Sequence, residues 1–207
     1  LFSVTFFLYD HPFEPSYQYL DSLNKEVKLR STSKDLDCWI GIGGGSSMDS
    51  AKVLAILATN PGKTIDYKGF PKNLNTPLPV ICVPSTTGTG SEVVYNASLI
   101  DEQTKIKMGV NYKRNYPKLA ILDPMIVLNS PLSVLSSSGC DALVHSLESF
   151  VSPKSTFESR MFSKKAYELI SKNLPLLLNG DGTLDNWLSM QWAAVFAMYS
   201  LSNSSSS

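Results

Sequence analysis

The first 125 residues alternate between two patterns of hydrophobic and polar positions. Three short apolar runs, at residues 4–9, 38–42 and 78–83, predict strands. Residues 17–30 repeat apolar side chains at helical spacing, and in residues 43–59 a glycine turn opens directly into a second helix. Strands that alternate with helices are typical of βαβ units, so we expect a parallel sheet with helices on both of its faces.

The pattern changes further along the chain. Residues 93–100 and 105–110 predict two strands of a hairpin around the turn at 101–104, and residues 118–122 predict one more short strand. From residue 132 onward glycines are sparse and helical periodicity dominates. The helices predicted in this part are 139–151, 157–173 and 184–201.

We therefore predict an α/β fold with two domains. A parallel-sheet nucleotide-binding domain spans residues 1–128, and an all-helical domain that is incomplete in this sequence spans residues 129–203. The serine-rich end, residues 204–207, predicts a disordered tail. Because the chain begins with Leu1 instead of Met, we also expect its natural start to be missing.

Composition excludes several classes of partner. Lys plus Arg and Asp plus Glu both number 18, so the formal net charge is zero and nothing in the charge pattern favours nucleic acid or an anionic membrane. No apolar run has the roughly 18 residues that a spanning helix needs. The three cysteines, Cys38, Cys82 and Cys140, are an odd number, which argues against a disulfide framework and favours a cytoplasmic protein with reduced thiols.

The first segment with candidate chemistry is Gly43-Gly44-Gly45-Ser46-Ser47-Met48-Asp49, which lies between a predicted strand and a predicted helix. Glycines allow a tight turn and close approach of a ligand, and the helix N-terminus directs N–H groups and partial positive charge toward an anion such as a pyrophosphate. The segment matches neither the G-x-G-x-x-G fingerprint nor the P-loop. Asp49 in the first helical turn is equally explained as an ordinary helix-start acid.

The second segment is Ser85-Thr86-Thr87-Gly88-Thr89-Gly90-Ser91-Glu92, again directly after a predicted buried strand. Its hydroxyl groups can hydrogen-bond phosphate or ribose oxygens, although a polar, glycine-rich loop can also serve only as a helix cap. Two such turns after parallel strands fall on the same carboxyl edge of the sheet, which is where ligands bind in open α/β sheets. The pair therefore favours a ligand site.

The third segment runs from Gly139 to Glu148 on a predicted helix. Asp141 and His145 are four residues apart, so both side chains project from one helix face and can chelate one metal ion. An oxygen and nitrogen pair suits Fe²⁺, Zn²⁺ or Mn²⁺. The alternative is a helix-start Asp beside an unrelated His, since D-x-x-x-H is common by chance.

Together, in this order and spacing, the segments resemble the iron-containing (group III) alcohol dehydrogenases. The family's GGGS-x-x-D-x-x-K motif is matched from Gly43 to Lys52, its P-T-T-x-G-T-x-S-E loop from Pro84 to Glu92, and its G-x-D-A-L-x-H-x-x-E motif from Gly139 to Glu148. The resemblance implies an enzyme that transfers hydride between NAD or NADP and a small alcohol or aldehyde, with a divalent metal, Fe²⁺ or alternatively Zn²⁺, as Lewis acid.

The resemblance also implies roles for particular residues. Gly44, Gly45 and Ser46 would hold the cofactor pyrophosphate, and Asp49 belongs to the same motif. The remaining cofactor-binding candidates are Thr86, Thr87 and Thr89, which would line the cofactor, and Asn96 and Lys107 near its nicotinamide-ribose side. Asp141 and His145 would be two of the metal ligands.

The chain departs from the family at three places. The family's metal site uses one Asp and three His, whereas this sequence contains only His11 and His145. Glu14 stands where many members carry Asn, and an acid is unfavourable near a pyrophosphate. The family's first strand-helix unit and its C-terminal part are not in the sequence. We therefore expect a fragment of an alcohol dehydrogenase that is catalytically inactive on its own.

Two alternatives remain open at this point. One is a lyase similar to dehydroquinate synthase, which also combines NAD with a metal and would use basic residues such as Lys154, Arg160, Lys164 and Lys165. The other is a non-catalytic nucleotide-binding module. The substrate, the choice between NAD and NADP and the oligomeric state are not predicted, and a homodimer is one option because family members often form dimers.

Overall fold

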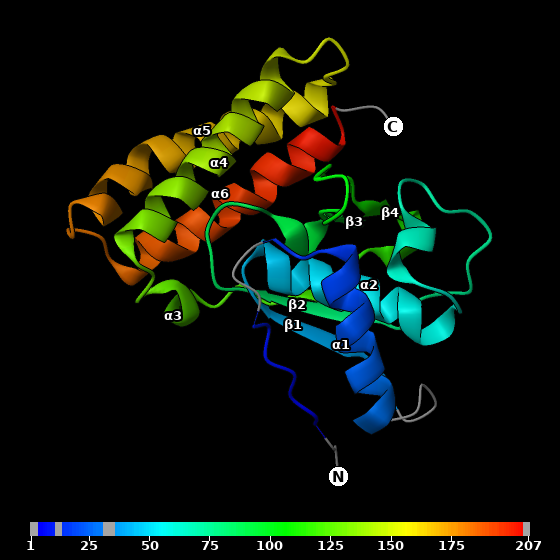
Figure 1. The fold of residues 1–207 in the computed structure, drawn as a ribbon. Helices are drawn as coiled ribbons and strands as arrows, with labels where there is room; N and C mark the ends of the chain where they lie inside the picture. The colour runs from blue at the N-terminus through cyan, green and yellow to red at the C-terminus, as the bar shows by residue number, and fades with distance from the viewer. Residues whose placement is uncertain (1–3, 11–13, 31–35, 205–207) are drawn as a thin grey trace.

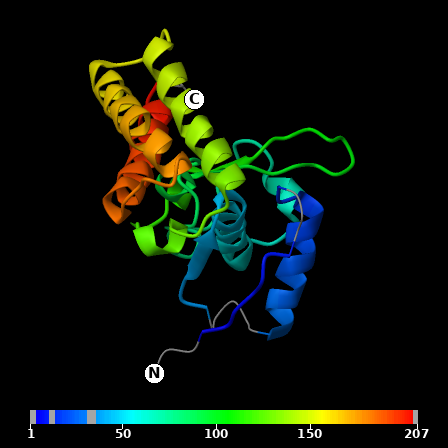
Figure 2. The same ribbon diagram turned by 90° about the vertical axis from the view of Figure 1, so that its left-hand side faces the viewer.

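The computed structural model describes residues 4–10, 14–30 and 36–204. An α/β part built around β1 (Trp39–Gly43), α2 (Gly45–Thr59) and β2 (Val80–Pro84) lies against a bundle of three long helices (Figure 1). A quarter turn of the molecule shows the bundle stacked on one end of the α/β part (Figure 2). The predicted α/β class with a parallel sheet is confirmed.

The sheet has three parallel strands in the order β1-β2-β5, with β5 at Leu119–Ala120. Trp39 pairs with Val80 and Gly43 with Pro84, so β1 and β2 run side by side over their full length. The chain between them contains α2, which makes β1-α2-β2 a βαβ unit as predicted. The strands predicted at 38–42, 78–83 and 118–122 are all present, each within two or three residues of its expected bounds.

Helix α2 covers one face of this sheet because its small and apolar side chains face the strands: Met48, Ala51 and Ala55 form one buried cluster with Val80 and Cys82. The predicted helix α1 (Tyr17–Arg30) packs on the far side of α2, where its buried residues meet the outward side chains of α2. Both helices therefore lie on the same side of the sheet.

The opposite face of the sheet differs from the prediction. Ile40 and Ile42 of β1 are 48% and 58% exposed, and Leu119 and Ile121 at β5 are also exposed. In residues 4–10, 14–30 and 36–204, no helix packs on these side chains. The expectation of helices on both faces is therefore wrong for this part of the chain, because α1 stacks on α2 instead of crossing to the other side.

The predicted strand at residues 4–9 is also wrong: residues 4–10 have no regular secondary structure, and Phe6 and Leu8 are more than three-quarters exposed. A strand needs a neighbouring strand to satisfy its backbone hydrogen bonds. Residues 4–10 pair with none of the described strands, so apolar and β-branched composition alone does not produce one.

The predicted hairpin is present but shorter than expected. Its paired segments are β3 (Asn96–Ala97) and β4 (Val110–Asn111), which are antiparallel, with an isolated bridge between Ile100 and Lys107 nearer the turn. Asp101 closes the turn by accepting hydrogen bonds from the Gln103 backbone and the Thr104 hydroxyl. Short 3₁₀ helices complete the α/β part: η1 (Thr64–Tyr67), η2 (Ser91–Val93) and η3 (Lys113–Asn115).

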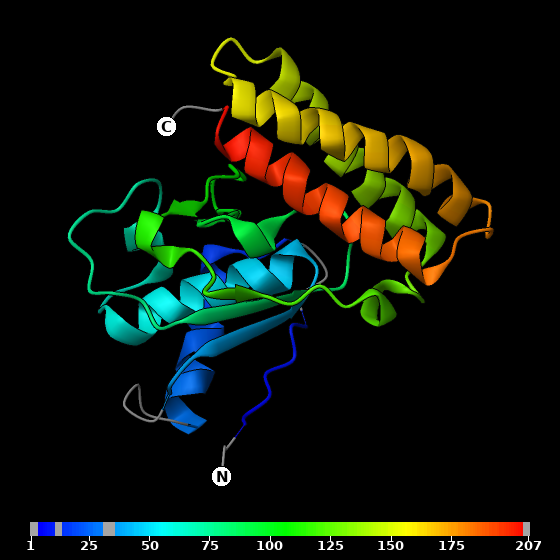
Figure 3. The ribbon, with the colours of Figure 1, turned by 180° about the vertical axis from the view of Figure 1, so that it is seen from behind.

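The second part begins with the short helix α3 (Pro124–Val127) and contains α4 (Leu132–Val151), α5 (Phe157–Leu178) and α6 (Leu184–Ser202). The three long helices pack against one another around an apolar core that includes Leu135, Ile170 and Met190 (Figure 3). The three predicted helices are confirmed, although α4 begins seven residues before the predicted start at Gly139.

Helices α5 and α6 each begin with a capping box, at Thr156 and Thr183. Ser204 differs from the expected disordered tail, because it is a buried turn residue whose carbonyl accepts a hydrogen bond from Ser152; residues 205–207 lie outside the described residues. Within the described residues, no helix has the length and apolar character to cross a membrane.

Candidate functional site

The two polar turns predicted to share an edge of the sheet lie in direct contact. The backbone N–H of Ser85, after β2, donates to the Gly43 carbonyl at the end of β1 over 2.8 Å. A Cβ placed on Gly45 would lie 3.1 Å from Cγ2 of Thr89, so only a residue without a side chain fits this approach comfortably. The parallel register of β1 and β2 is what brings the turns together.

The first turn ends at the N-terminus of α2. The N–H groups of Ser47 and Met48 bond to the Gly44 carbonyl, while those of Gly45 and Ser46 have no backbone acceptor in the described part of the chain. Gly44 is the N-cap and supplies no side-chain cap. Two free donors and the positive end of a four-turn helix therefore point outward, which is an arrangement that attracts an anion.

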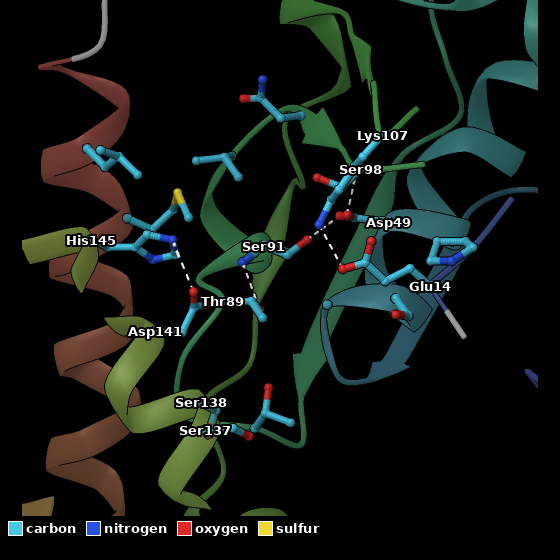
Figure 4. A pocket seen from close by; sticks show the side chains of 18 of the residues that line it. Glu14, Asp49, Thr89, Ser91, Ser98, Lys107, Ser137, Ser138, Asp141 and His145 are labelled. Carbon is cyan, nitrogen blue, oxygen red and sulfur yellow. Dashed lines mark hydrogen bonds and ion pairs between the residues drawn. The ribbon is translucent and has the colours of Figure 1, made fainter. Parts of the chain in front are cut away.

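A cavity of about 710 Å³ opens beside this turn, between the α/β part and helices α4 and α6 (Figure 4). It has the size of a typical small-molecule or cofactor site. Nine of the eleven predicted site residues line it; Gly44 and Thr87 do not. The nine are Gly45, Ser46, Asp49, Thr86, Thr89, Asn96, Lys107, Asp141 and His145.

Asp49 holds the loops around the cavity in place. Its Oδ1 accepts from the Lys52 ammonium at 3.1 Å and from the Ser91 hydroxyl at 2.5 Å, and its Oδ2 accepts from the Ser98 N–H at 2.8 Å. Lys52 is fully buried and also donates to Ser91 and to the Asn96 carbonyl. The donors to both carboxylate oxygens of Asp49 are protein groups, so this side chain stabilises the cavity wall.

The hydroxyl groups of Thr86 and Thr87 show whether the residues around the cavity are compatible with a polar ligand. Both hydroxyl oxygens are buried, and neither has a hydrogen-bond partner among the described residues. A buried hydroxyl without a partner costs free energy, typically about 1–3 kcal/mol. Thr86 lines the cavity, so an acceptor or donor on a bound nucleotide would satisfy its hydroxyl. The residues present therefore fit a nucleotide.

Tyr9 contributes to the same turn from the irregular segment 4–10. Burial raises the pKa of Tyr9 to about 12, and a hydrogen bond with the Ser46 side chain offsets part of the rise. The phenol is therefore neutral at physiological pH and adds no negative charge beside the free N–H groups. The strand expected here is replaced by a segment that contacts the glycine turn.

Lys107 and Glu14 form an ion pair at the cavity, with 2.7 Å between Nζ and Oε1. The two side chains are about half exposed, and both line the cavity. Nearby, the Asn96 side-chain amide donates to Asn111 Oδ1 across the hairpin at 2.6 Å. The acid at position 14 thus lies beside the predicted site, where it partners a lysine.

Asp141 and His145 lie on the opposite wall, on α4, with 3.5 Å between Asp141 Oδ1 and His145 Nε2 (Figure 4). His145 Nδ1 is buried without a partner among the described residues. One carboxylate oxygen and one imidazole nitrogen suit a divalent transition metal. No group of three or more His, Cys, Asp or Glu side chains gathers anywhere in the described residues, and His11 lies outside them. The residues present fit part of a metal site.

The cavity is also lined by residues of the helices that the sequence did not predict. Val134, Ser137 and Ser138 lie in the first two turns of α4, before its predicted start, and Met198 and Ser202 lie on α6. The glycine at position 88 was the sequence feature that could have indicated the α4 residues Val134, Ser137 and Ser138, because a glycine permits close contact with a helix backbone. A Cβ on Gly88 would lie 2.2 Å from the Ser138 carbonyl oxygen, which means that the loop after β2 packs directly on the α4 backbone.

Two further titratable groups lie behind the cavity. Burial raises the pKa of Glu92 to about 7, an effect that a backbone hydrogen bond and the Lys52 charge only partly offset. Burial likewise raises the pKa of the Cys82 thiol to about 12. Cys38, Cys82 and Cys140 are all free, and of the three only Cys82 is fully buried. The neutral, buried thiol agrees with a structural role for Cys82, whereas Cys140 is exposed.

The fold and cavity define the class to which the chain belongs: α/β proteins that bind a ligand at the carboxyl edge of a parallel sheet, here beneath a helical bundle. Comparison with known proteins narrows the class. A family model for iron-containing alcohol dehydrogenase matches residues 5–124, which is more than half of the chain. The chain belongs to the iron-containing alcohol dehydrogenase family of oxidoreductases.

Individual relatives agree with this family assignment. Alcohol dehydrogenase 4 of Schizosaccharomyces pombe is 35% identical over 172 residues, which is 83% of this chain and 40% of the relative. NAD-dependent methanol dehydrogenase of Bacillus methanolicus is 32% identical over 82% of this chain and 45% of its own length. The chain therefore spans less than half the length of these relatives. The crystal structure of sulfoacetaldehyde reductase from Bifidobacterium kashiwanohense in complex with NAD⁺ superposes with a TM-score of 0.84, at 26% identity, over 92% of this chain and 50% of that one.

Proposed function

We propose that this chain supplies the cofactor wall, and part of the metal wall, of an enzyme that transfers hydride between a nicotinamide dinucleotide and a small alcohol or aldehyde. One observation carries the proposal: a single cavity has the free N–H groups of the α2 N-terminus on one side and Asp141 with His145 on the other. Residues 1–128 and 129–203 would be its two domains, and the protein would act in the cytoplasm.

On the cofactor wall, the N–H groups of Gly45 and Ser46 bind the pyrophosphate, with Gly44 shaping the turn. The hydroxyls of Thr86 and Thr89, which line the cavity, bind further oxygens of the cofactor, while Asn96 and Lys107 contact its nicotinamide-ribose side. Thr87 is buried in the same loop, outside the cavity lining. Asp49 keeps this wall in place through Lys52 and Ser91. Relatives that use or hold NAD favour NAD over NADP for this chain.

On the metal wall, Asp141 and His145 would hold a divalent ion, Fe²⁺ or Zn²⁺. Such an ion would supply Lewis-acid stabilisation of negative charge on the substrate oxygen. The chain's own residues orient this wall: α4 fixes the spacing of the two ligands, and the buried Nδ1 of His145 is held away from bulk water. Because two protein ligands hold a catalytic ion weakly, we expect no hydride transfer by the 207-residue chain alone.

NADH binding to the purified chain, followed by fluorescence, tests the cofactor wall. Gly45→Asp places a negative charge at the α2 N-terminus and should abolish binding, because it repels the pyrophosphate. Asn73→Asp adds the same charge on an exposed residue outside the cavity and should leave binding unchanged. Equal binding by the wild type and Gly45→Asp would contradict the proposal.

Co²⁺ absorbance tests the metal wall, since cobalt replaces Fe²⁺ or Zn²⁺ and reports its ligands by colour. The wild-type chain should bind Co²⁺ weakly, and His145→Gln should remove that binding. Asp185→Asn, at the start of α6 and outside the cavity, should not change it. Binding that survives loss of His145 would place the metal elsewhere.

The lyase alternative receives no support from the cavity. Lys164 forms an exposed pair with Glu168 on α5, Arg160 bonds to Ser155, and neither lines the cavity. Lys107 is the only lysine or arginine among the cavity residues. A site for a phosphorylated, carboxylated substrate would need more positive charge. A non-catalytic module would leave Asp141 and His145 unexplained.

We retain a small alcohol or aldehyde as the proposed substrate and a homodimer as the proposed assembly.

A further inference from the structure

The Glu14–Lys107 pair joins two segments that are 93 residues apart in the chain. Lys107 lies on the second arm of the hairpin, opposite Ile100, and Glu14 lies two residues before Ser16, which forms an isolated bridge with Ile100 just before α1. Figure 4 shows the two side chains meeting at the cavity, on the side of Asp49 and Ser98. The pair is half exposed, so it contributes little to folding. Its place at the cavity suggests an effect on ligands.

The charges around the cavity are few. Asp49 is neutralised by the buried Lys52, and Asp141 lies on the far wall beside His145. Among the described residues that line the cavity, Lys107 is the only lysine or arginine, and its ammonium group is already paired with the Glu14 carboxylate. An anionic ligand meets a neutral pair in place of a free ammonium group.

We infer that Glu14 restrains Lys107 and thereby weakens the binding of an anionic dinucleotide, so that Glu14 sets the cofactor affinity of this chain. The inference rests on the proposed function. The ligand must draw the ammonium away from a carboxylate at 2.7 Å before it gains the attraction of Lys107. Binding then depends on the N–H groups of α2 and on the threonine hydroxyls more than on charge.

Glu14→Gln tests the inference directly, because the amide keeps the shape of the side chain and removes its charge. We expect NADH to bind about two- to fivefold more tightly to this variant, the range set by a single solvated charge. The affinity should also depend more steeply on salt, since Lys107 is then free to attract the anion. Glu168→Gln is the matched control: it releases Lys164 on α5 and changes the net charge equally, but it lies outside the cavity.

Lys107→Gln separates restraint from simple repulsion. If Glu14 acts by holding Lys107, the gain from Glu14→Gln is clearly smaller when Lys107 is also replaced, because only the repulsion by the Glu14 carboxylate itself is then removed. If Glu14 only repels the ligand at a distance, the gain is the same with and without Lys107, and the inference is overturned. A gain shared by Glu168→Gln overturns it as well.

The same four proteins, wild type, both single variants and the double variant, are titrated with inorganic pyrophosphate to separate this inference from the proposed function. Pyrophosphate binding that strengthens in Glu14→Gln clearly more when Lys107 is present supports the restraint, even where no protein binds NADH and the dehydrogenase proposal fails. Unchanged affinity of Glu14→Gln for both ligands, in a chain whose circular dichroism matches the wild type, overturns it.

Discussion

The two walls of the cavity are built by different means. The α/β wall buries charges: Lys52 is fully buried, and Asp49 and Glu92 are less than a tenth exposed. The helical wall buries neutral hydroxyl groups instead, such as Ser149 and Ser200, which bond to each other. Buried charges are costly unless they are paired, whereas serine hydroxyls in helices bond to nearby carbonyls at little cost.

The difference between the two walls shows that loops need hydrogen bonds from outside to hold their side chains in place. Loops have no internal ladder of hydrogen bonds, so the loops at residues 85–98 need cross-links, and Asp49 and Lys52 supply them from the rigid helix α2. Helix α4 positions Asp141 and His145 through its own backbone, so no such network is required.

The largest effect is expected from Lys52→Met, which removes the buried cation of the α/β wall. The change leaves the Asp49 carboxylate buried without a cation, and we expect the free energy of unfolding to fall by about 3–5 kcal/mol. Urea denaturation measures the loss. Lys165→Met removes an exposed lysine on α5 and should change stability by less than about 0.5 kcal/mol. Similar losses from both would contradict the contrast.

The second largest effect is expected in the pH dependence of the free energy of unfolding, through Glu92 of the α/β wall. The folded pKa of Glu92, about 7, lies above the ordinary glutamate pKa of 4.5, so the folded state holds a proton that the unfolded state releases between these pH values. Stability should therefore fall as pH rises from about 4.5 to 7, by about 3 kcal/mol in total. Glu92→Gln should remove that slope in denaturation curves recorded from pH 4.5 to 8. A slope that persists would assign the effect to another group.

Gly88→Ala tests the contact between the walls. The added methyl group would lie 2.2 Å from the Ser138 carbonyl oxygen, and backbone atoms of α4 cannot move aside cheaply. We expect a loss of about 2 kcal/mol in the free energy of unfolding, as for other overpacked sites. In Gly44→Ala the added methyl group meets only Thr86 Cγ2 at 3.4 Å, so its thermal midpoint should fall less.

The smallest effect is expected in the helical part alone. Thr156→Ala removes the side chain that accepts from the Ser159 N–H at the start of α5, and helix caps of this kind contribute about 1 kcal/mol. Thr156→Ser keeps the cap and should match the wild type in thermal denaturation. A loss equal to that of Lys52→Met would mean that the two parts unfold as one unit from this end.

Much of the fold could be predicted from local patterns. Periodicity found α1, α2 and the three long helices, and apolar runs found β1, β2 and β5, because these elements bury side chains at regular spacing. Candidate residues of the two turns, of the hairpin and of α4 could also be named, and nine of them line one cavity.

The remainder depends on contacts between distant segments. Residues 4–10 have the composition of a strand, but pairing requires a neighbour that no local pattern specifies. Val134 and Met198 carry no chemical signal, and they reach the cavity only because α4 and α6 pack against the loop after β2. The same holds for the ion pair of Glu14 with Lys107, which depends on the path of the hairpin.

The contact of Gly88 with α4 has a mechanical consequence. The loop that carries Thr86, Thr87 and Thr89 rests on the backbone of α4 without an intervening side chain, and η2, just beyond, packs on α6. This loop therefore joins the two parts at a contact that leaves no room for a side chain at position 88. The threonines of this loop therefore lie where the α/β part and the helical bundle meet, whereas Lys107 on the hairpin lies away from that contact.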